Sequence, residues 1–272
     1  MRRHVIAALR LSTSIAMLAS ATAIAQEYHP SEATELAKAS QNPVGDMVSV
    51  PLQVNFLSGG GLGDGTIYAL NLQPVLPLSI GQGWNVIARP IVPYTNAPDA
   101  RDGAYGLGDI QLQLFFAPAQ SADVMWGVGP FFSFPTATND GARTGAWGLG
   151  PALVGVRQSG AFVLGALLTH LWTFADYENE LPNISLLTLQ PFINFNFSDG
   201  WALNFSPILT GNWTAPDGEQ YTIPLGLGFT KVTGVAGQPL SLSAHYYRNV
   251  VHPEDGGTDN LRLQLTFLFP SR

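Results

Sequence analysis

The fold is decided by the stretch Leu261-Arg262-Leu263-Gln264-Leu265-Thr266-Phe267-Leu268-Phe269, in which apolar and polar side chains alternate almost one for one. Strict period-2 alternation gives a β-strand two chemically different faces. About twelve stretches of this kind follow one another along the chain. Repeated behind an export signal, they predict a membrane barrel with an apolar outside and a polar inside.

The N-terminus has the pattern of a secretory signal peptide. Three arginines precede a short apolar stretch at 15–19, and Ala23-Ile24-Ala25 fits the small-x-small cleavage rule. The alternative, an uncleaved anchor, needs about 20 apolar residues, more than this segment offers. We therefore expect a signal peptide at 1–25, a polar lead-in at 26–45 with a short helix over 31–40, and a barrel at 46–272.

The predicted strands are joined by connectors that alternate between long and short. Short periplasmic turns and longer outer loops are the usual asymmetry of bacterial outer-membrane barrels. The chain is therefore predicted to be all-β, a transmembrane antiparallel up-and-down barrel of about 12 strands. The expected strands cover 48–56, 68–78, 84–94, 110–116, 124–134, 149–156, 162–172, 185–197, 201–209, 221–229, 240–247 and 261–269.

Charge is concentrated in the predicted connectors. Removal of the signal leaves nine basic and nineteen acidic residues, a net charge of −10, which argues against nucleic acid as a partner. Twelve of the acidic residues lie in connectors, and only Arg89, Asp109 and Arg262 lie well inside the alternating stretches. A lipid-facing arginine costs about 2–4 kcal/mol at the bilayer midplane, so such strands are expected to be nearly free of charge. The absence of cysteine excludes disulfides and thiol chemistry.

Aromatic residues lie near the ends of the predicted strands, which is typical of the two girdles of a membrane barrel. Prolines inside the strands oppose this interpretation, since proline cannot donate to a β-ladder. We expect bulges or missing ladder bonds there. The aromatic set is Trp84, Trp126, Phe162 and Trp201 beside short turns, and Tyr68, Tyr94, Trp147, Trp172 and Tyr221 beside long loops; the prolines are Pro51, Pro74, Pro90, Pro130, Pro151, Pro191, Pro207 and Pro224.

If the leucines of the last strand face lipid, their polar neighbours face the lumen. The same alternation of inward and outward positions, here called parity, applied to other strands predicts a wall dominated by amides and hydroxyls with few charges. Such a wall is suited to neutral or weakly charged solutes. For the three charged residues, internal salt bridging is an equal alternative. Interior glycines either leave open space or permit tight curvature. The lumen-lining candidates are Arg89, Asp109, Gln111, Gln113, Gln190, Asn194, Ser243, His245, Arg262 and Gln264.

The sequence predicts no catalytic residue, metal site or cofactor. Ser243-Ala244-His245 places a hydroxyl and an imidazole on one strand face, but parity points them into the lumen, away from a lipid substrate, and no third group orients the imidazole. No His/Asp/Glu cluster has metal-ligand spacing, and the glycine-rich run at 59–63 lacks a following helix to hold a phosphate.

The expected partners are outer-membrane lipids and lipopolysaccharide, the barrel-insertion machinery and a small-molecule solute. The acidic loops either bridge to lipopolysaccharide through divalent cations or are simply solvated. The ending Pro270-Ser271-Arg272 differs from the terminal aromatic that usually guides barrel insertion.

A set of motifs resembles a proteobacterial family of outer-membrane transporters, associated by name with phenol degradation and sometimes mislabelled neuromedin U. The resemblance covers nearly all of the chain after the signal and implies an outer-membrane β-barrel, without an agreed substrate or catalytic residues. It rests on Gln41-Asn42-Pro43-Val44-Gly45-Asp46, Leu72-Gln73-Pro74-Val75, Gly106-Leu107-Gly108-Asp109, Phe134-Pro135-Thr136-Ala137-Thr138, Trp147-Gly148-Leu149-Gly150-Pro151 and Phe267-Leu268-Phe269-Pro270.

Two functions from different classes follow from these observations, with a third of lower rank. The first is a monomeric channel for passive passage of small solutes, aromatic or weakly polar ones among them. The second is a closed structural or surface-binding barrel that transports nothing. An outer-membrane lipid hydrolase would need Ser243 and His245 in hydrogen-bond contact on the lipid side.

Overall fold

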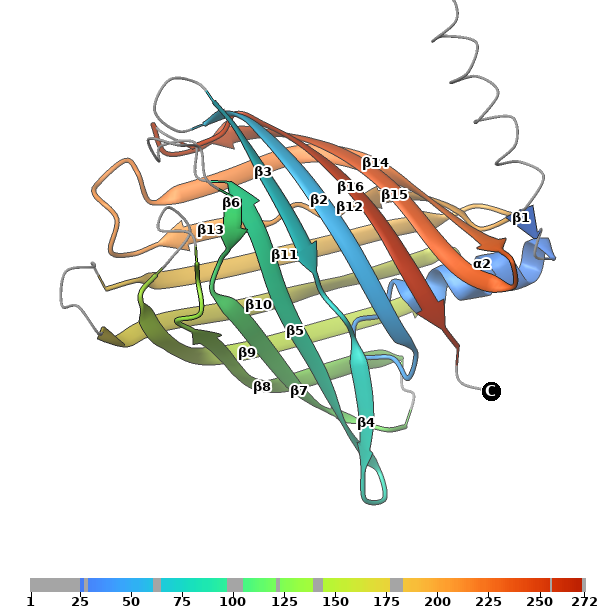
Figure 1. Ribbon diagram of the computed structural model, residues 1–272. Coiled ribbons are helices and arrows are strands. Elements are labelled where there is room, and N and C mark those ends of the chain that lie inside the picture. Colours follow the sequence, from blue (N-terminus) through green and yellow to red (C-terminus); the bar gives the residue numbers. More distant parts are fainter. Residues whose placement is uncertain are drawn as a thin grey trace, which may run out of the picture.

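The computed structural model describes residues 25–26, 29–60, 65–96, 105–120, 123–138, 144–176, 183–254 and 256–270. They form a closed antiparallel barrel of twelve strands with one short helix at one end (Figure 1). The expected fold class is thereby confirmed. The predicted signal peptide lies outside the described residues, apart from Ala25, which belongs to a two-residue strand, β1 (Ala25–Gln26), paired with the end of β14.

Nine barrel strands are continuous and three are interrupted. The interrupted strands are β3 with β4, β6 with β7, and β12 with β13. The bounds are β2 Val48–Gly60, β3 Gly65–Leu72, β4 Leu76–Ile80, β5 Trp84–Asn96, β6 Tyr105–Leu107, β7 Ile110–Pro118, β8 Val124–Phe134, β9 Ala146–Ser159, β10 Phe162–Asp176, β11 Ser185–Asn196, β12 Trp201–Phe205, β13 Leu209–Asn212, β14 Tyr221–Val235, β15 Gln238–Val251 and β16 Asp259–Phe269.

The barrel closes between its first and last strands. Each strand pairs with its neighbours in sequence, and β16 returns to β2 through eleven antiparallel pairs, from Asp259–Ser58 to Phe269–Val48. Closure satisfies the backbone polar groups of both terminal strands, which a membrane-spanning sheet requires. We call the end with the tight turns 81–83, 160–161, 197–200 and 236–237 the short-turn end, and the opposite end the long-loop end.

The strand prolines lie where the ladder is irregular. Pro74 and Pro207 lie in the interruptions of β3/β4 and β12/β13, and a register shift separates Ile223 from Pro224. Pro130 and Pro151 face each other across β8 and β9. A proline has no N–H to donate, so these positions fit the missing ladder bonds that the sequence led us to expect.

The lead-in segment lies across the short-turn end of the barrel (Figure 1). Its helix, α2 (Pro30–Ser40), begins with a proline in the first turn, where the missing N–H has no intrahelical partner in any case. Ala37 packs against Val232 of β14 and Leu268 of β16. Among the described residues, no helix combines the length and the apolar character needed to cross a membrane.

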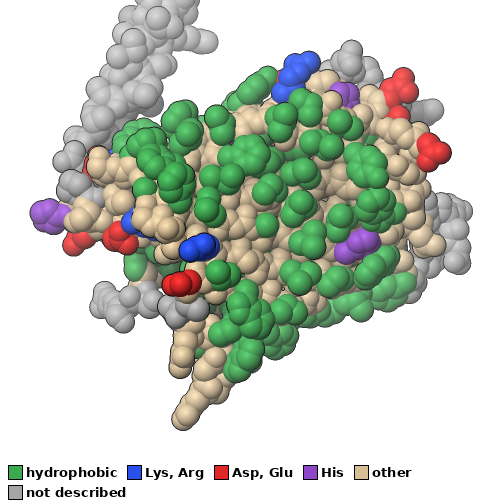
Figure 2. Space-filling model, turned by 180° about the vertical axis from the view of Figure 1, so that it is seen from behind, with side chains coloured by type: hydrophobic (Ala, Val, Ile, Leu, Met, Phe, Trp, Pro, Cys, Tyr) green, Lys and Arg blue, Asp and Glu red, His purple; other side chains and the backbone are tan. Residues whose placement is uncertain are grey.

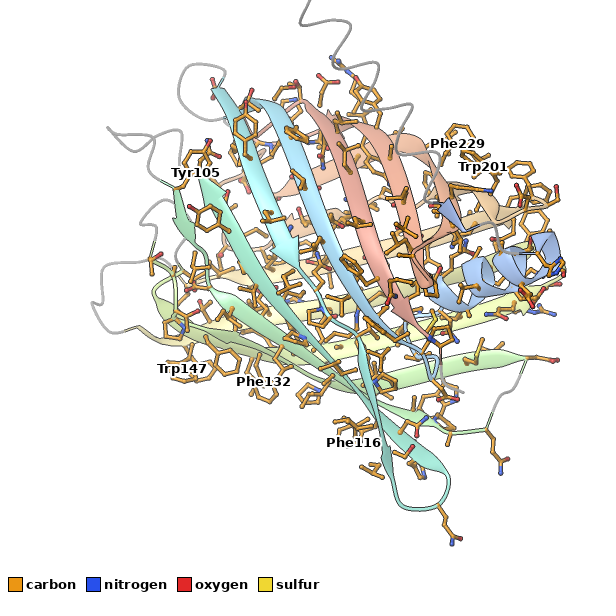
Figure 3. The ribbon with its side chains drawn as sticks, turned by 45° about the vertical axis from the view of Figure 1, so that its right-hand side comes forward. Tyr105, Phe116, Phe132, Trp147, Trp201 and Phe229 are labelled. Atoms are coloured by element: carbon orange, nitrogen blue, oxygen red, sulfur yellow. The ribbon has the colours of Figure 1, made fainter. Side chains whose placement is uncertain are left out.

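The outer surface of the barrel is apolar on its flank. Figure 2 shows apolar side chains spread over that flank and acidic side chains at the ends. All nine residues of the expected aromatic girdles are exposed. The side chains of Tyr105, Trp147 and Trp201 point away from the wall (Figure 3). This surface suits lipid contact, with aromatic rings at the two interface levels.

Candidate functional site: the lumen chamber

The barrel interior has an apolar half and a polar half. The apolar half belongs mainly to β7 to β10, whose inward side chains pack into one buried cluster. Val44 of the lead-in joins this cluster from the short-turn end. The alternation of polar and apolar residues predicted a lumen dominated by amides and hydroxyls and did not indicate this apolar half. The cluster consists of Val44, Ile87, Phe115, Ala117, Phe131, Ala152, Val154, Val156, Val163, Leu167, Leu171 and Phe192.

Interior glycines leave space that neighbouring apolar side chains occupy. A Cβ on Gly148 would lie 2.8 Å from the Leu171 side chain, and one on Gly165 would lie 2.3 Å from the Phe192 ring. At these two positions neighbouring side chains occupy the space beside the glycines, which argues against the open-space alternative. As a result, the free volume is displaced towards the opposite, polar half.

The polar half encloses a cavity of about 230 Å³, here called the lumen chamber. Its wall comes from β2, β5, β11, β12 and β14 to β16, and its floor from the lead-in residues 40–43. The chamber is lined by Ser40, Gln41, Asn42, Pro43, Ser49, Pro51, Gln53, Gln73, Val75, Arg89, Leu167, Gln190, Phe192, Asn194, Asn204, Ser206, Ile208, Thr230, Ser241, Ser243, His245, Arg262, Gln264 and Thr266.

Seven of the ten predicted lumen residues line this chamber: Arg89, Gln190, Asn194, Ser243, His245, Arg262 and Gln264. The other three do not. Gln113 is buried and accepts a hydrogen bond from Arg89, and Gln111 lies two residues further along β7. Asp109 is also buried, but its carboxylate holds a loop rather than facing the chamber, as described next.

Asp109 organises the long-loop end of the barrel. Its Oδ1 accepts the backbone N–H groups of Thr136 and Ala137, each at 3.0 Å, and its Oδ2 accepts the Thr144 N–H and hydroxyl, each at 2.6 Å. Four donors to one carboxylate make short, charge-assisted bonds. Within the described residues Asp109 forms no ion pair with Arg89 or Arg262, so it does not neutralise either one.

Arg262 is the centre of the polar wall. It is 5% exposed, and its guanidinium carbon lies 5.0 Å from the centre of the Tyr247 ring. Its Nε donates to Asn55 Oδ1 at 3.3 Å, and an Nη donates to the backbone oxygen of Ser206 at 3.2 Å. That carbonyl is available because the interruption between β12 and β13 removes it from the ladder. All the partners are neutral, so the positive charge stays uncompensated by protein.

His245 and Arg89 add two further polar groups to the chamber. The His245 ring stacks on Tyr247 at 5.9 Å between centres, and it fits because Gly228 opposite has no side chain: a Cβ there would lie 2.1 Å from the ring. Arg89 donates to Gln113 at 3.4 Å. In the described structure His245 Nδ1 and Arg89 Nε are buried without a hydrogen-bond partner. Sequence parity placed these residues inside but did not indicate unpaired nitrogens.

The chamber has no arrangement for nucleophilic catalysis among the described residues. Ser243 and His245 both face inward, as parity predicted, and the hydrogen bonds of the described side chains include none between them. The lipid hydrolase hypothesis required such a bond on the outer face. The described residues also contain no group of three or more His, Cys, Asp or Glu side chains placed to hold a metal ion.

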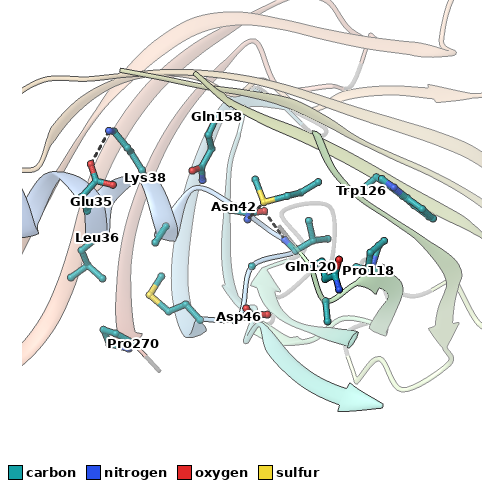
Figure 4. A pocket seen from close by; sticks show the side chains of 17 residues that line it. Glu35, Leu36, Lys38, Asn42, Asp46, Pro118, Gln120, Trp126, Gln158 and Pro270 are labelled. Atoms are coloured by element: carbon teal, nitrogen blue, oxygen red, sulfur yellow. Dashed lines mark hydrogen bonds and ion pairs between the residues drawn. The ribbon is translucent and has the colours of Figure 1, made fainter. Parts of the chain in front are cut away.

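The lead-in separates the chamber from a second hollow at the short-turn end. This recess has a volume of about 350 Å³ and lies between the lead-in and the rim formed by β7, β8 and β9 (Figure 4). Asn42 lines both hollows. Its Nδ2 donates to Met125 Sδ at 3.1 Å, and its Oδ1 accepts the Val44 N–H. A single short segment therefore forms the partition between lumen and exterior at this end.

The partition is fixed to the barrel by side-chain hydrogen bonds. Gln41 and Asn196 form a reciprocal amide pair at 2.9 and 3.1 Å. The Thr34 hydroxyl donates to the Phe197 carbonyl and accepts the Gly200 N–H, each at 3.3 Å. The sequence predicted a helix here but gave no sign of its docking, because its partners lie more than 150 positions away.

Twelve antiparallel strands closed by their termini, an apolar flank with aromatic ends and a polar chamber define the fold of an outer-membrane-type β-barrel. The chain is similar to an outer-membrane channel of Pseudomonas putida F1, with 13% identity, a TM-score of 0.60, and coverage of 82% of this chain and 94% of that chain. It is also similar to the NanC porin, with 9% identity, a TM-score of 0.52, and coverage of 82% and 100%. No family model matches the sequence, and neither does any curated protein.

Proposed function

We propose that the chain is an outer-membrane channel through which small solutes pass passively. The observation that carries the proposal is the polar chamber inside a barrel whose outer face is compatible with lipid. A soluble barrel has no reason to expose Leu225, Leu227 and Phe229 along one strand face, each more than half exposed. In this proposal the short-turn end faces the periplasm and the long-loop end faces the outside.

The route runs from the long-loop end to the chamber and then past the partition into the recess. Passage requires the lead-in around Asn42 to move, since this segment floors the chamber. The motion breaks a small number of neutral hydrogen bonds, worth about 0.5–1.5 kcal/mol each, and withdraws Val44 from the apolar cluster, at about 1.5–3 kcal/mol. A displacement of this cost is accessible on the microsecond-to-millisecond scale of loop and lid motions. The lead-in is therefore proposed to act as a gate.

A barrel that stays closed is the second candidate, favoured by the docked lead-in itself. A cross-linking experiment separates the two. The chain has no native cysteine, so a Gln41→Cys/Asn196→Cys pair can be joined selectively with a short, reducible bis-thiosulfonate cross-linker. For a channel, liposome swelling or planar-bilayer conductance falls on cross-linking and returns on reduction. The Gln41→Cys single variant treated with the same reagent is the control.

The absence of conductance and swelling in the reduced protein would reject the channel. Equal activity of the cross-linked and reduced forms would instead reject the lead-in as its gate. The proposed location is tested separately by fractionation, which should recover the chain in outer membranes with heat-modifiable electrophoretic mobility. Membership of the phenol-degradation-associated transporter family stays a proposal, supported by the ordered motifs alone.

A further inference from the structure

We propose that the lumen chamber is a binding site for small organic carboxylates with an apolar body. The inference deepens the proposed channel function by naming a solute class for the same site. It goes beyond the sequence-based expectation of a lumen suited to neutral or weakly charged solutes. The reason is a charge imbalance in the wall of the chamber.

The chamber carries two cations and no anion. Arg89 and Arg262 line it, and none of its described lining residues is acidic. A buried charge without a counter-charge is unfavourable, so buried cations in proteins are normally paired. Among the described residues the buried carboxylate is Asp109, which accepts four hydrogen bonds from Thr136, Ala137 and Thr144. The missing counter-charge can therefore be supplied by a solute.

Donor geometry selects a carboxylate. A guanidinium has five N–H groups in a planar fork that matches two carboxylate oxygens. Arg262 uses its Nε and one Nη on neutral acceptors, and Tyr247 covers one face of the fork. These contacts fix the position of the guanidinium and leave further N–H groups for the chamber. Arg89 Nε has no acceptor, although its Nη reaches Gln113.

The apolar part of the chamber lining selects an apolar body. Leu167, Phe192 and Ile208 add apolar surface to this lining, beside the polar groups. A cavity of about 150 Å³ is known to accommodate benzene, so the 230 Å³ of the chamber suffices for a ring that carries a carboxylate. A solute with both parts would supply the missing counter-charge and bury its ring, whereas a neutral isostere would bury its ring and accept hydrogen bonds without neutralising the arginines.

Benzoate and its neutral isostere benzamide test this proposal by titration calorimetry on the full barrel in micelles. Benzoate is expected to bind at least about tenfold more tightly than benzamide. The reason is that each hydrogen bond to a charged group contributes about tenfold or more in affinity. Arg262→Gln and Arg89→Gln should each lower benzoate affinity about tenfold or more and leave benzamide unchanged. Arg262→Lys, which keeps the charge but loses the fork, should retain a weaker preference for benzoate.

The matched control is Arg157→Gln, which removes the same charge from an exposed position on β9, outside the chamber. Equal affinity for benzoate and benzamide would overturn the inference, as would an Arg157→Gln effect as large as that of Arg262→Gln. Heat-modifiable electrophoretic mobility confirms that each variant is folded. If Arg262→Gln does not fold, Arg89→Gln takes its place in the comparison. Binding in micelles does not need passage, so benzoate binding without conductance would reject the channel and leave the site standing.

Discussion

Replacement of Gly150 with alanine tests how closely β9 and β10 approach in the barrel wall. The paired residues of β10 and β9 run as far as Thr169–Ala152 and resume at Trp172–Leu149. Between these two pairs, at Gly150 and Pro151, the described strands have no paired residues. There a Cβ on Gly150 would lie 1.6 Å from the His170 carbonyl oxygen, whereas ordinary contacts begin at 3.4 Å. The two strands must therefore separate by about 1.8 Å along that direction to admit one methyl group.

The expected cost follows from this overlap. Overpacking of a tight interior costs about 1–3 kcal/mol, and loss of an adjacent ladder bond adds about 0.5–1.5 kcal/mol. We therefore expect Gly150→Ala to lower the free energy of unfolding by about 2–4 kcal/mol, which is about 30- to 700-fold in the equilibrium constant. Urea unfolding of the barrel in lipid vesicles, followed by tryptophan fluorescence and gel mobility, measures the change.

Gly155 of the same strand is the control. No atom lies within 4 Å of a Cβ built there, so Gly155→Ala should be neutral or stabilise the barrel by about 0.5–1 kcal/mol through lower chain entropy. Similar unfolding midpoints for the two variants would refute the reasoning, because they would mean that β9 and β10 have room between them. A Gly150→Ala barrel that does not fold at all agrees with the upper end of the range.

Three further predictions concern the outer face, the long-loop end and the lead-in. Leu263→Arg, on the lipid side of β16, should destabilise the barrel in vesicles by about 2–4 kcal/mol, whereas Gln264→Arg, on the lumen side, should mainly change ion preference in planar bilayers. Asp109→Asn turns one acceptor oxygen into an NH2 group that cannot accept the N–H donors facing it, so it should cost about 1–3 kcal/mol in urea unfolding, together with faster proteolysis near Thr136 and Thr144. Thr34→Val removes both hydrogen bonds between α2 and the turn after β11, so channel opening should increase about 5- to 30-fold in bilayer recordings; an unchanged open probability would contradict the gate.

Most of the fold could be predicted because the lipid-facing surface constrains every strand. The strand expected at 124–134 has those bounds in the structure, and the twelve-strand count is confirmed. Alternation is strong where one face meets lipid and the other meets polar groups, as in β16. The ends of β14 and β15 extend further than expected, since period-2 patterning weakens near connectors.

The candidate site was only partly predictable. Parity finds inward polar residues such as Asn194 and Arg262, but it cannot find an inward residue on a strand that is apolar on both faces. Val163 and Leu167 are of that kind, so the apolar half of the interior gave no periodic signal. The role of Asp109 depended on where Thr136, Ala137 and Thr144 lie, which local sequence does not specify.

The docking of α2 has a consequence for biogenesis. Thr34 and Gln41 find their partners 155 to 166 positions later in the chain, in and after β11. Because the chain is made from its N-terminus, α2 is complete before these partners exist, and its docking has to wait for the C-terminal half of the chain. The pairing of β2 with β16 joins residues about 200 positions apart in the chain. Closure of the barrel and docking of the lead-in therefore both belong to the final stage of assembly.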